Sequence, residues 1–193
     1  MPSAGRVGSR VSLRYQIPDG FTDVVGHLEA LTPIVLVRTK TGELVEIAPG
    51  DVVSVRELSH VPVRNSQIRD LARREALARP AAEQHWSSGW LLRADPSADI
   101  QLNSAVPLEF SAGTAALAEI IDWYTQRGLP AWLDLPERLL PIRVAGVSPS
   151  RILTLGEQYV RVPDDDPAAI ARFESLGFRL HHRARFVSAT ELI

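Results

Sequence analysis

Residues 162–186 read VPDDDPAAIARFESLGFRLHHRARF and contain the clearest helix and strand signals in the chain. Three aspartates at 164–166 precede Pro167, and acidic side chains beside a proline are typical of a helix N-terminus. The pattern predicts a helix over 168–176 that stops at Gly177, followed by a terminal strand over 178–187. Three consecutive aspartates can also hold a cation. We favour the helix cap because it also accounts for the position of Pro167.

The first 58 residues have a β pattern. Polar and apolar side chains alternate over 10–15, which is the period of a half-buried strand. Turns rich in proline and glycine separate further segments of this kind. The predicted strands cover 10–15, 23–31, 34–39, 44–47 and 52–56. Strands this short cannot bury a flat sheet alone, so we expect residues 1–60 to curl into a small β-barrel.

The remaining chain, 61–193, mixes helix and strand signals and is expected to form a second domain. Apolar residues repeat at helical spacing over 65–77 and 114–127, and Gly128 follows the second helix at the usual capping position. The predicted strands cover 86–93, 101–108, 129–135, 152–155 and 158–162. The fold class is therefore α+β.

The composition excludes several classes of protein. Apolar residues make up 45% of the 193 residues and charged residues 23%, as in ordinary globular proteins. No apolar run reaches about 18 residues and the N-terminus lacks a signal-peptide pattern, so we predict no membrane span and a cytoplasmic location. The absence of cysteine excludes thiolate catalysis. A net charge of −2 gives no general attraction to nucleic acid or membrane, so we expect neither as a partner.

Common catalytic and metal-binding motifs are missing. The chain has no G-x-S-x-G nucleophile turn and no phosphate-binding P-loop. His181 and His182 are adjacent, and on a regular strand they would point to opposite faces, so we predict no metal site. The arginines of 61–80 could contact nucleic acid, but a solvated helix face explains them better in a slightly acidic chain.

The quoted segment resembles the last helix and strand of GNAT-superfamily N-acetyltransferases. Their pattern is Asn-x-x-Ala-x-x-x-Tyr-x-x-x-Gly-Phe, followed by a strand. Ala169, Gly177 and Phe178 match this pattern, whereas Asp166 replaces the asparagine and Phe173 the tyrosine. In many of these enzymes the tyrosine protonates the leaving coenzyme thiolate, which a phenylalanine cannot do. The resemblance thus makes Phe173 a catalytic position without its proton donor; the alternative is a core residue.

Four more segments, 5–11, 62–66, 89–94 and 103–108, resemble an actinobacterial, chiefly mycobacterial, acetyltransferase family. Its members carry an SH3-like barrel ahead of a GNAT-like mixed α/β domain. The resemblance implies acetyl transfer from acetyl-CoA to an amine that attacks the thioester directly. It suggests Asn103 and Trp90 as substrate contacts, with a strand-end hydrogen bond and core packing as the respective alternatives.

The superfamily holds the coenzyme pyrophosphate in a glycine-containing turn that opens a helix. The nearest string here is RVAGVS at 143–148, followed by Pro149 where the helix should begin. Arg143 and Gly146 are therefore candidate coenzyme contacts, together with Asp166 at the place of the family's asparagine.

The relatives are also longer, because a strand–helix unit separates two segments that meet in this chain near 154–156. We therefore predict an incomplete GNAT-like domain with weak or absent activity, which leaves open whether the chain is an active enzyme. A partner chain or a second copy in a homo-oligomer could cover the incomplete sheet. The alternative is a non-catalytic interaction module whose barrel binds a peptide, a protein or nucleic acid.

Overall fold

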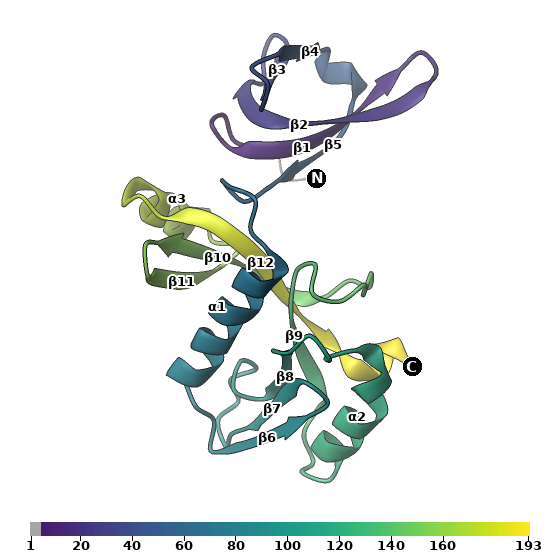
Figure 1. The fold of residues 1–193 in the computed structure, drawn as a ribbon, viewed down its shortest axis with the longest axis vertical. Helices are drawn as coiled ribbons and strands as arrows, with labels where there is room; N and C mark the ends of the chain where they lie inside the picture. Colours follow the sequence, from purple (N-terminus) through teal and green to yellow (C-terminus); the bar gives the residue numbers. More distant parts are fainter. Residues whose placement is uncertain (1–4) are drawn as a thin grey trace. The chain divides into compact units, whose positions relative to one another are not determined.

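The computed structural model describes residues 5–193 and has an α+β fold with two sheets. The chain divides into two compact units, Met1–Pro62 and Val63–Ile193, each with its own sheet (Figure 1). Among the described residues, no helix is long and apolar enough to cross a membrane.

The first unit is a five-stranded antiparallel sheet in the order β4-β3-β2-β1-β5. The five strands predicted from the sequence are all present, with ends shifted by up to three residues. Its elements are β1 (Arg10–Ile17), β2 (Gly20–Ala30), β3 (Val35–Thr39), β4 (Leu44–Ile47), the short 3-10 turn η1 (Pro49–Asp51) and β5 (Val52–Glu57). Alternate residues such as Val11, Leu13 and Leu28 are fully buried, so one face of the sheet forms the core of this unit.

The second unit is built on a seven-stranded sheet in the order β11-β10-β12-β9-β8-β7-β6. Strands β8 and β9 are parallel and are joined through helix α2, and the other described pairs are antiparallel. The strands are β6 (Glu83–Ser87), β7 (Trp90–Ala94), β8 (Ser104–Pro107), β9 (Trp132–Pro136), β10 (Val147–Leu155), β11 (Gln158–Pro163) and β12 (Arg179–Ser188). The helices are α1 (Asn65–Ala78), α2 (Leu117–Thr125) and α3 (Pro167–Ser175), with 3-10 turns η2 (Thr114–Ala116) and η3 (Ala189–Leu192).

Helices α1 and α2 pack on opposite faces of this sheet. Leu91 and Val106 contact the small residues of α1, whereas Trp90, Leu92 and Ala105 contact α2. Successive residues of a strand point to opposite faces, so each strand contributes to both layers. The face under α1 is the one that carries the polar site described below.

The junction expected near 154–156 is a tight hairpin. Leu155 pairs with Gln158, and Gly156 adopts a left-handed φ of 57° in the turn. Strands β10 and β11 are therefore direct neighbours, and the sheet runs without interruption from edge strand β11 to edge strand β6.

Several of the predicted strands differ from the structure. β10 begins at Val147 where the sequence predicted 152, and β9 begins at Trp132 where it predicted 129. The strand predicted over 86–93 is a hairpin, because Ser88 and Gly89 both adopt positive φ and turn the chain between β6 and β7. The strand predicted over 101–108 is shortened to β8, since the backbone N–H groups of Leu102 and Asn103 donate to the Asp99 carbonyl and form a turn there.

The cap predicted for α3 is confirmed. The Asp166 carboxylate accepts a hydrogen bond from the backbone N–H of Ala169 at 2.9 Å, and Pro167 is the first helical residue. Gly177 ends the helix with a φ of 96°. These local signals position the helix against Leu153 and Phe178 of the sheet layer.

Replacing Asp166 with alanine removes this cap and should lower the free energy of unfolding by about 1 kcal/mol. Urea unfolding measures the change, and Asp165→Ala at the neighbouring position is the control. An equal loss in both variants would contradict the capping role of Asp166.

Candidate functional site

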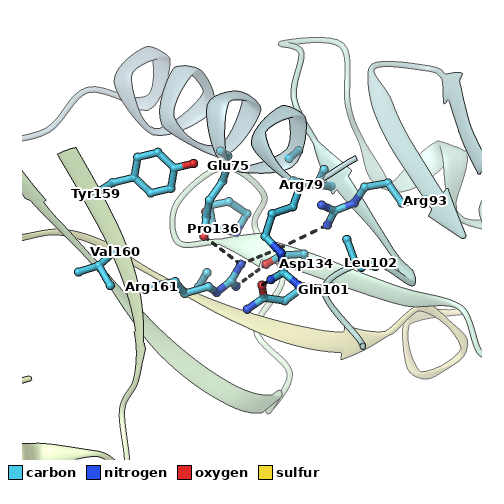
Figure 2. A pocket seen from close by; sticks show the side chains of 14 residues that line it. Glu75, Arg79, Arg93, Gln101, Leu102, Asp134, Pro136, Tyr159, Val160 and Arg161 are labelled. Atoms are coloured by element: carbon cyan, nitrogen blue, oxygen red, sulfur yellow. Dashed lines mark hydrogen bonds and ion pairs between the residues drawn. The ribbon is translucent and has the colours of Figure 1, made fainter. Parts of the chain in front are cut away.

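A charged cavity of about 320 Å³ lies between α1 and the sheet of the second unit (Figure 2). It combines a wall of small and apolar side chains with charged groups from both layers. The lining residues are Ala72, Glu75, Ala76, Arg79, Arg93, Gln101, Leu102, Val106, Asp134, Pro136, Tyr159, Val160, Arg161 and Ala184. A concave site with a few convergent polar groups is typical of a small-molecule pocket.

The charged groups reach the cavity from four elements. Glu75 lies on α1, and Arg79 is the C-cap residue that follows the last helical residue, Ala78. Arg93 on β7, Asp134 on β9 and Arg161 on β11 are single charged residues within largely apolar strands. Each points to the face of the sheet that α1 covers.

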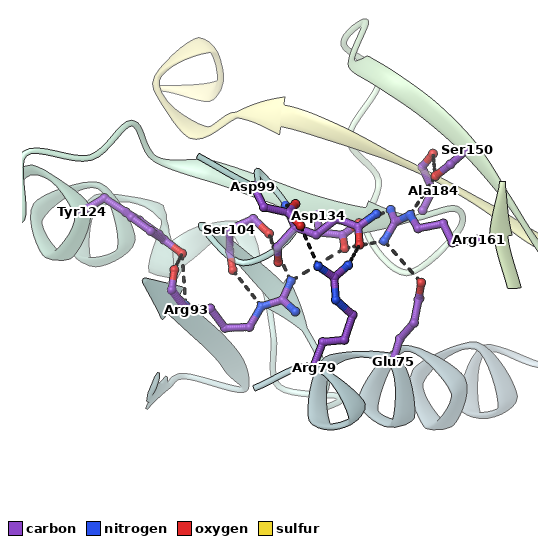
Figure 3. A network of polar contacts seen from close by, with 11 residues as sticks. Glu75, Arg79, Arg93, Asp99, Ser104, Tyr124, Asp134, Ser150, Arg161 and Ala184 are labelled. Atoms are coloured by element: carbon purple, nitrogen blue, oxygen red, sulfur yellow. Dashed lines mark hydrogen bonds and ion pairs between the residues drawn. The ribbon is translucent and has the colours of Figure 1, made fainter. Parts of the chain in front are cut away.

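The strongest contact in the cavity is a bidentate ion pair between Arg161 and Asp134 (Figure 3). The guanidinium donates to the two carboxylate oxygens at 2.8 and 2.7 Å, and Arg161 Nε also donates to Ser150 Oγ at 2.9 Å. A second guanidinium nitrogen, Arg93 Nη2, lies 3.9 Å from Asp134 Oδ2. Asp134 and Arg161 expose 8% and 10% of their side chains, so this pair is shielded from water.

The environment of the pair keeps both groups charged. Burial would raise the pKa of Asp134, but the charge and hydrogen bonds of Arg161 outweigh burial and hold it below its usual value. Burial would likewise lower the pKa of Arg161, and the Asp134 carboxylate raises it instead. Asp134 is therefore a fixed anion whose charge is already neutralised within the protein.

Glu75 has a different environment, although it borders the same cavity. Burial raises the pKa of its carboxyl to about 7, and the nearby charge of Arg161 only partly opposes this effect. Its Oε1 lies 3.6 Å from Arg161 Nη1, beyond the range of a strong hydrogen bond. Glu75 can therefore take up or release a proton near neutral pH, as a general acid or base requires.

Arg93 is held in place by the strand and helix around it. Its Nε donates to the Ser104 carbonyl at 3.3 Å and its Nη2 to Ser104 Oγ at 3.1 Å. The Tyr124 hydroxyl donates to the Arg93 carbonyl at 3.0 Å and accepts from the Arg93 backbone N–H at 3.2 Å. Burial raises the pKa of Tyr124, so this hydroxyl stays protonated.

Asn103, a predicted substrate contact, is bonded within its own loop. Its Oδ1 accepts from the Asp95 N–H at 2.9 Å, and its Nδ2 donates to the carbonyls of Ser97 and Asp99. The same loop presents Asp99 and Gln101 to Arg79, whose guanidinium donates to both. Asn103 thus shapes the rim of the cavity without lining it, in agreement with the hydrogen-bonding alternative.

Trp90, the other predicted substrate contact, is fully buried. Its indole N–H donates to the Gly113 carbonyl at 3.2 Å, and its ring packs in the core beneath α2. This places Trp90 on the face of the sheet opposite the cavity, as the core-packing alternative expected.

Phe173 and Asp166 also lie apart from the cavity. Phe173 packs edge-to-face on Phe178 with ring centroids 5.4 Å apart and joins the apolar cluster around α3. Asp166 caps the same helix. Neither residue lines the cavity, so their roles at a coenzyme site stay predictions.

The turn expected to hold pyrophosphate does not have the geometry of a phosphate loop. The segment 143–148 leads into strand β10, so no helix N-terminus follows Arg143 and Gly146. Gly146 is pressed against β12, where an added Cβ would lie 2.6 Å from the Phe186 carbonyl oxygen. Its glycine is explained by this close packing, and these residues do not fit a coenzyme pyrophosphate.

The adjacent histidines differ from the prediction. A bulge in β12 places His181 opposite no residue of β10, and the two rings meet with their Nδ1 atoms 2.8 Å apart. Burial, with smaller contributions from the neighbouring His181 and Arg161, lowers the pKa of His182 to about 3. Among residues 5–193 there is no cluster of three or more groups that could hold a metal ion.

The arginines of α1 contact other residues of the second unit. Arg73 lies over the Trp86 ring and donates to the Leu108 carbonyl, and Arg74 donates to the Glu157 carbonyl. Their side chains are 39% and 48% exposed, as expected for a solvated helix face, and a contact with nucleic acid stays an untested alternative.

Sequence reasoning missed the central residues of the cavity. Glu75, Asp134 and Arg161 belong to no recognisable sequence motif, and none of them was predicted as a site residue. One signal was available: a lone charged residue inside an apolar strand, as in WLDLP and QYVRVP, requires a partner if that strand is buried.

The comparisons with known proteins support an acetyltransferase-type relationship. A family model described as the C-terminal part of the probable histone acetyltransferase Rv0428c matches residues 65–156, and one for its N-terminal Sm-like domain matches residues 5–56. The chain is 42% identical over 183 residues to the probable histone acetyltransferase Rv0428c of Mycobacterium tuberculosis (strain ATCC 25618 / H37Rv). The aligned region covers 92% of this chain and 60% of that protein. No solved structure matches the chain.

Replacing Asp134 with asparagine should destabilise the second unit strongly. The change leaves two buried guanidinium groups without their anion, and breaking a buried pair in this way costs about 3–5 kcal/mol. Urea unfolding gives the loss. Glu29→Gln breaks the exposed pair with Arg38 in the first unit and should cost far less, because solvent screens exposed ion pairs. Similar losses in the two variants would contradict the central position of Asp134.

Glu75 should make the stability of the chain depend on pH. Its carboxyl has a pKa of about 7 in the folded chain against 4.5 for an unperturbed group. The protonated Glu75 therefore contributes fully to the free energy of unfolding below pH 4.5, and this contribution is lost as the pH rises through 7. Relative to the Glu75→Gln variant, the free energy of unfolding of the native chain should fall by about 3 kcal/mol across this pH range. Urea unfolding of both proteins from pH 4 to 8.5 measures the difference, and a constant difference would contradict the raised pKa.

Proposed function

We propose that this chain is an acetyltransferase homologue that transfers an acetyl group slowly from acetyl-CoA to an amine bound in the charged cavity. The observation that carries the proposal is the Glu75 carboxyl, which borders the cavity with a pKa of about 7. Glu75 and Asp134 both lie within the segment that resembles an acetyltransferase. The relative's name is compatible with acetyl-CoA as the donor.

Direct acetyl transfer requires the protein to bind the amine and to supply a base that deprotonates it. An amine is mostly protonated at neutral pH, and the ammonium form has no lone pair to attack a thioester. Glu75 accepts one proton from the ammonium nitrogen, and the free amine forms a C–N bond at the acetyl carbon. The C–S bond then breaks, the coenzyme leaves as a thiolate, and the second nitrogen proton is lost to solvent, from which the thiolate is protonated. A carboxylate with a pKa near the working pH is well matched to this proton transfer.

Two observations support slow turnover. The segment 143–148 does not form a helix-opening turn for a pyrophosphate, and Phe173 cannot supply a proton to the leaving thiolate. The family-model match ends at residue 156, beside the junction where the sequence suggested a missing strand–helix unit. The proposed GNAT-like character and the SH3-like character of the first unit rest on the sequence resemblance.

Thiol release from acetyl-CoA, measured with a panel of amines, tests the function. We expect turnover well below the rate of about 1 s⁻¹ or more that is typical of enzymes. Glu75→Gln should lower it at least tenfold further, whereas Arg73→Gln, which changes the same helix away from the cavity, should leave it unchanged. Turnover at an ordinary rate contradicts the proposal of slow transfer. Absence of both turnover and calorimetric binding of acetyl-CoA contradicts acetyl transfer itself.

A further inference from the structure

We propose that the amine accepted by this cavity carries its own anionic group, as a free amino acid does. The inference rests on the proposed acetyl transfer and specifies the class of the acceptor. It excludes simple monoamines, polyamines and the lysine side chains of basic proteins as preferred ligands. The argument depends on which charges in the cavity are still available to a ligand.

The negative charge of the cavity is largely used within the protein. Asp134 receives two hydrogen bonds from Arg161 and lies 3.9 Å from a nitrogen of Arg93. An additional cation placed beside it would meet two guanidinium groups at short range. Asp134 therefore fixes the arginines and does not offer a site for an ammonium group.

Glu75 is the remaining carboxylate that lines the cavity. It can meet one ammonium group, but Arg161 lies 3.6 Å from its oxygen and already balances part of its charge. The buried set of Glu75, Asp134, Arg93 and Arg161 is electrically neutral when Glu75 is ionised. A ligand with only positive charge would leave this set with an uncompensated cation in a site shielded from water.

Arg79 supplies a partner for a ligand's anion. It follows Glu75 by four residues and is the C-cap residue of α1, directly after the last helical residue Ala78. Figure 2 shows both side chains reaching into the same cavity. The Arg79 side chain is 56% exposed, and its guanidinium forms a surface ion pair with Asp99 at 2.7 Å and a hydrogen bond to Gln101 at 2.8 Å. Because this pair is exposed and therefore weak, a ligand's anion can replace Asp99 at Arg79. A guanidinium binds a carboxylate or a phosphate with good geometry.

The size of the cavity also favours a small ligand. Its volume of about 320 Å³ is at the lower end of the range for small-molecule pockets. Alanines at 72, 76 and 184 leave space, while Val106 and Val160 give apolar contact for an uncharged side chain. One small molecule can thus place its ammonium at Glu75 and its anion at Arg79.

Matched pairs of ligands test the inference. Free amino acids with uncharged side chains are compared with their carboxamides, which keep the ammonium and lose the anion. Binding to the full chain is measured at pH 7.5 by calorimetry and by the shift in melting temperature. Spermidine and a lysine peptide blocked by an N-terminal acetyl group and a C-terminal amide represent ligands with positive charge alone. The variants are Arg79→Gln and, as a control on the same helix, Arg73→Gln, whose side chain contacts Trp86 and Leu108 outside the cavity.

We expect at least one free amino acid to bind tenfold or more tightly than its carboxamide. Arg79→Gln should reduce this preference to less than threefold, and Arg73→Gln should preserve it. The inference is overturned if carboxamides, spermidine or the lysine peptide bind as tightly as the free amino acids, or if no amino acid binds. Acetylation of the lysine peptide would then leave the proposed acetyl transfer standing, whereas amino-acid binding without any thiol release would refute the transfer and keep the ligand class.

Discussion

The buried ion pair between Asp134 and Arg161 is the interaction on which the second unit depends. It links β9 to the edge strand β11 across the two strands that lie between them in the sheet. The guanidinium has room because the strands below it present small residues, Ser150 and Ala184, on that face. Each of the two charged groups is stable in this low-dielectric layer only because the other is present, and Arg93 and Glu75 lie beside the pair at 3.9 and 3.6 Å.

One consequence of this pair is that the two carboxyl groups of the cavity have different pKa values. Asp134 is surrounded by arginine donors and remains an anion, whereas Glu75 shares only a longer contact with Arg161 and has a pKa near neutrality. Environments that separate the pKa values of neighbouring titratable groups are characteristic of functional sites.

The sequence predicted local features far better than the site. The cap at Asp166, the stop at Gly177 and the five strands of the first unit follow from short-range rules, and all are present. The hairpin at Ser88 and Gly89 was missed because its apolar flanks read as one continuous strand. The cavity could not be predicted, because its charged residues come from four separate segments and only the strand order brings them together.

The tight turn at Gly156 has a consequence for how this unit folds. It lets β10 and β11 pair through residues only a few positions apart, and a hairpin of this kind forms on a timescale of about 1–10 μs. A chain with an extra segment at this point would have to close a longer loop before the same strands could meet. The short connection therefore lowers the contact order of this edge of the sheet. The β10–β11 hairpin, which carries Arg161, can thus form before it joins the part of the sheet that contains β9 and Asp134.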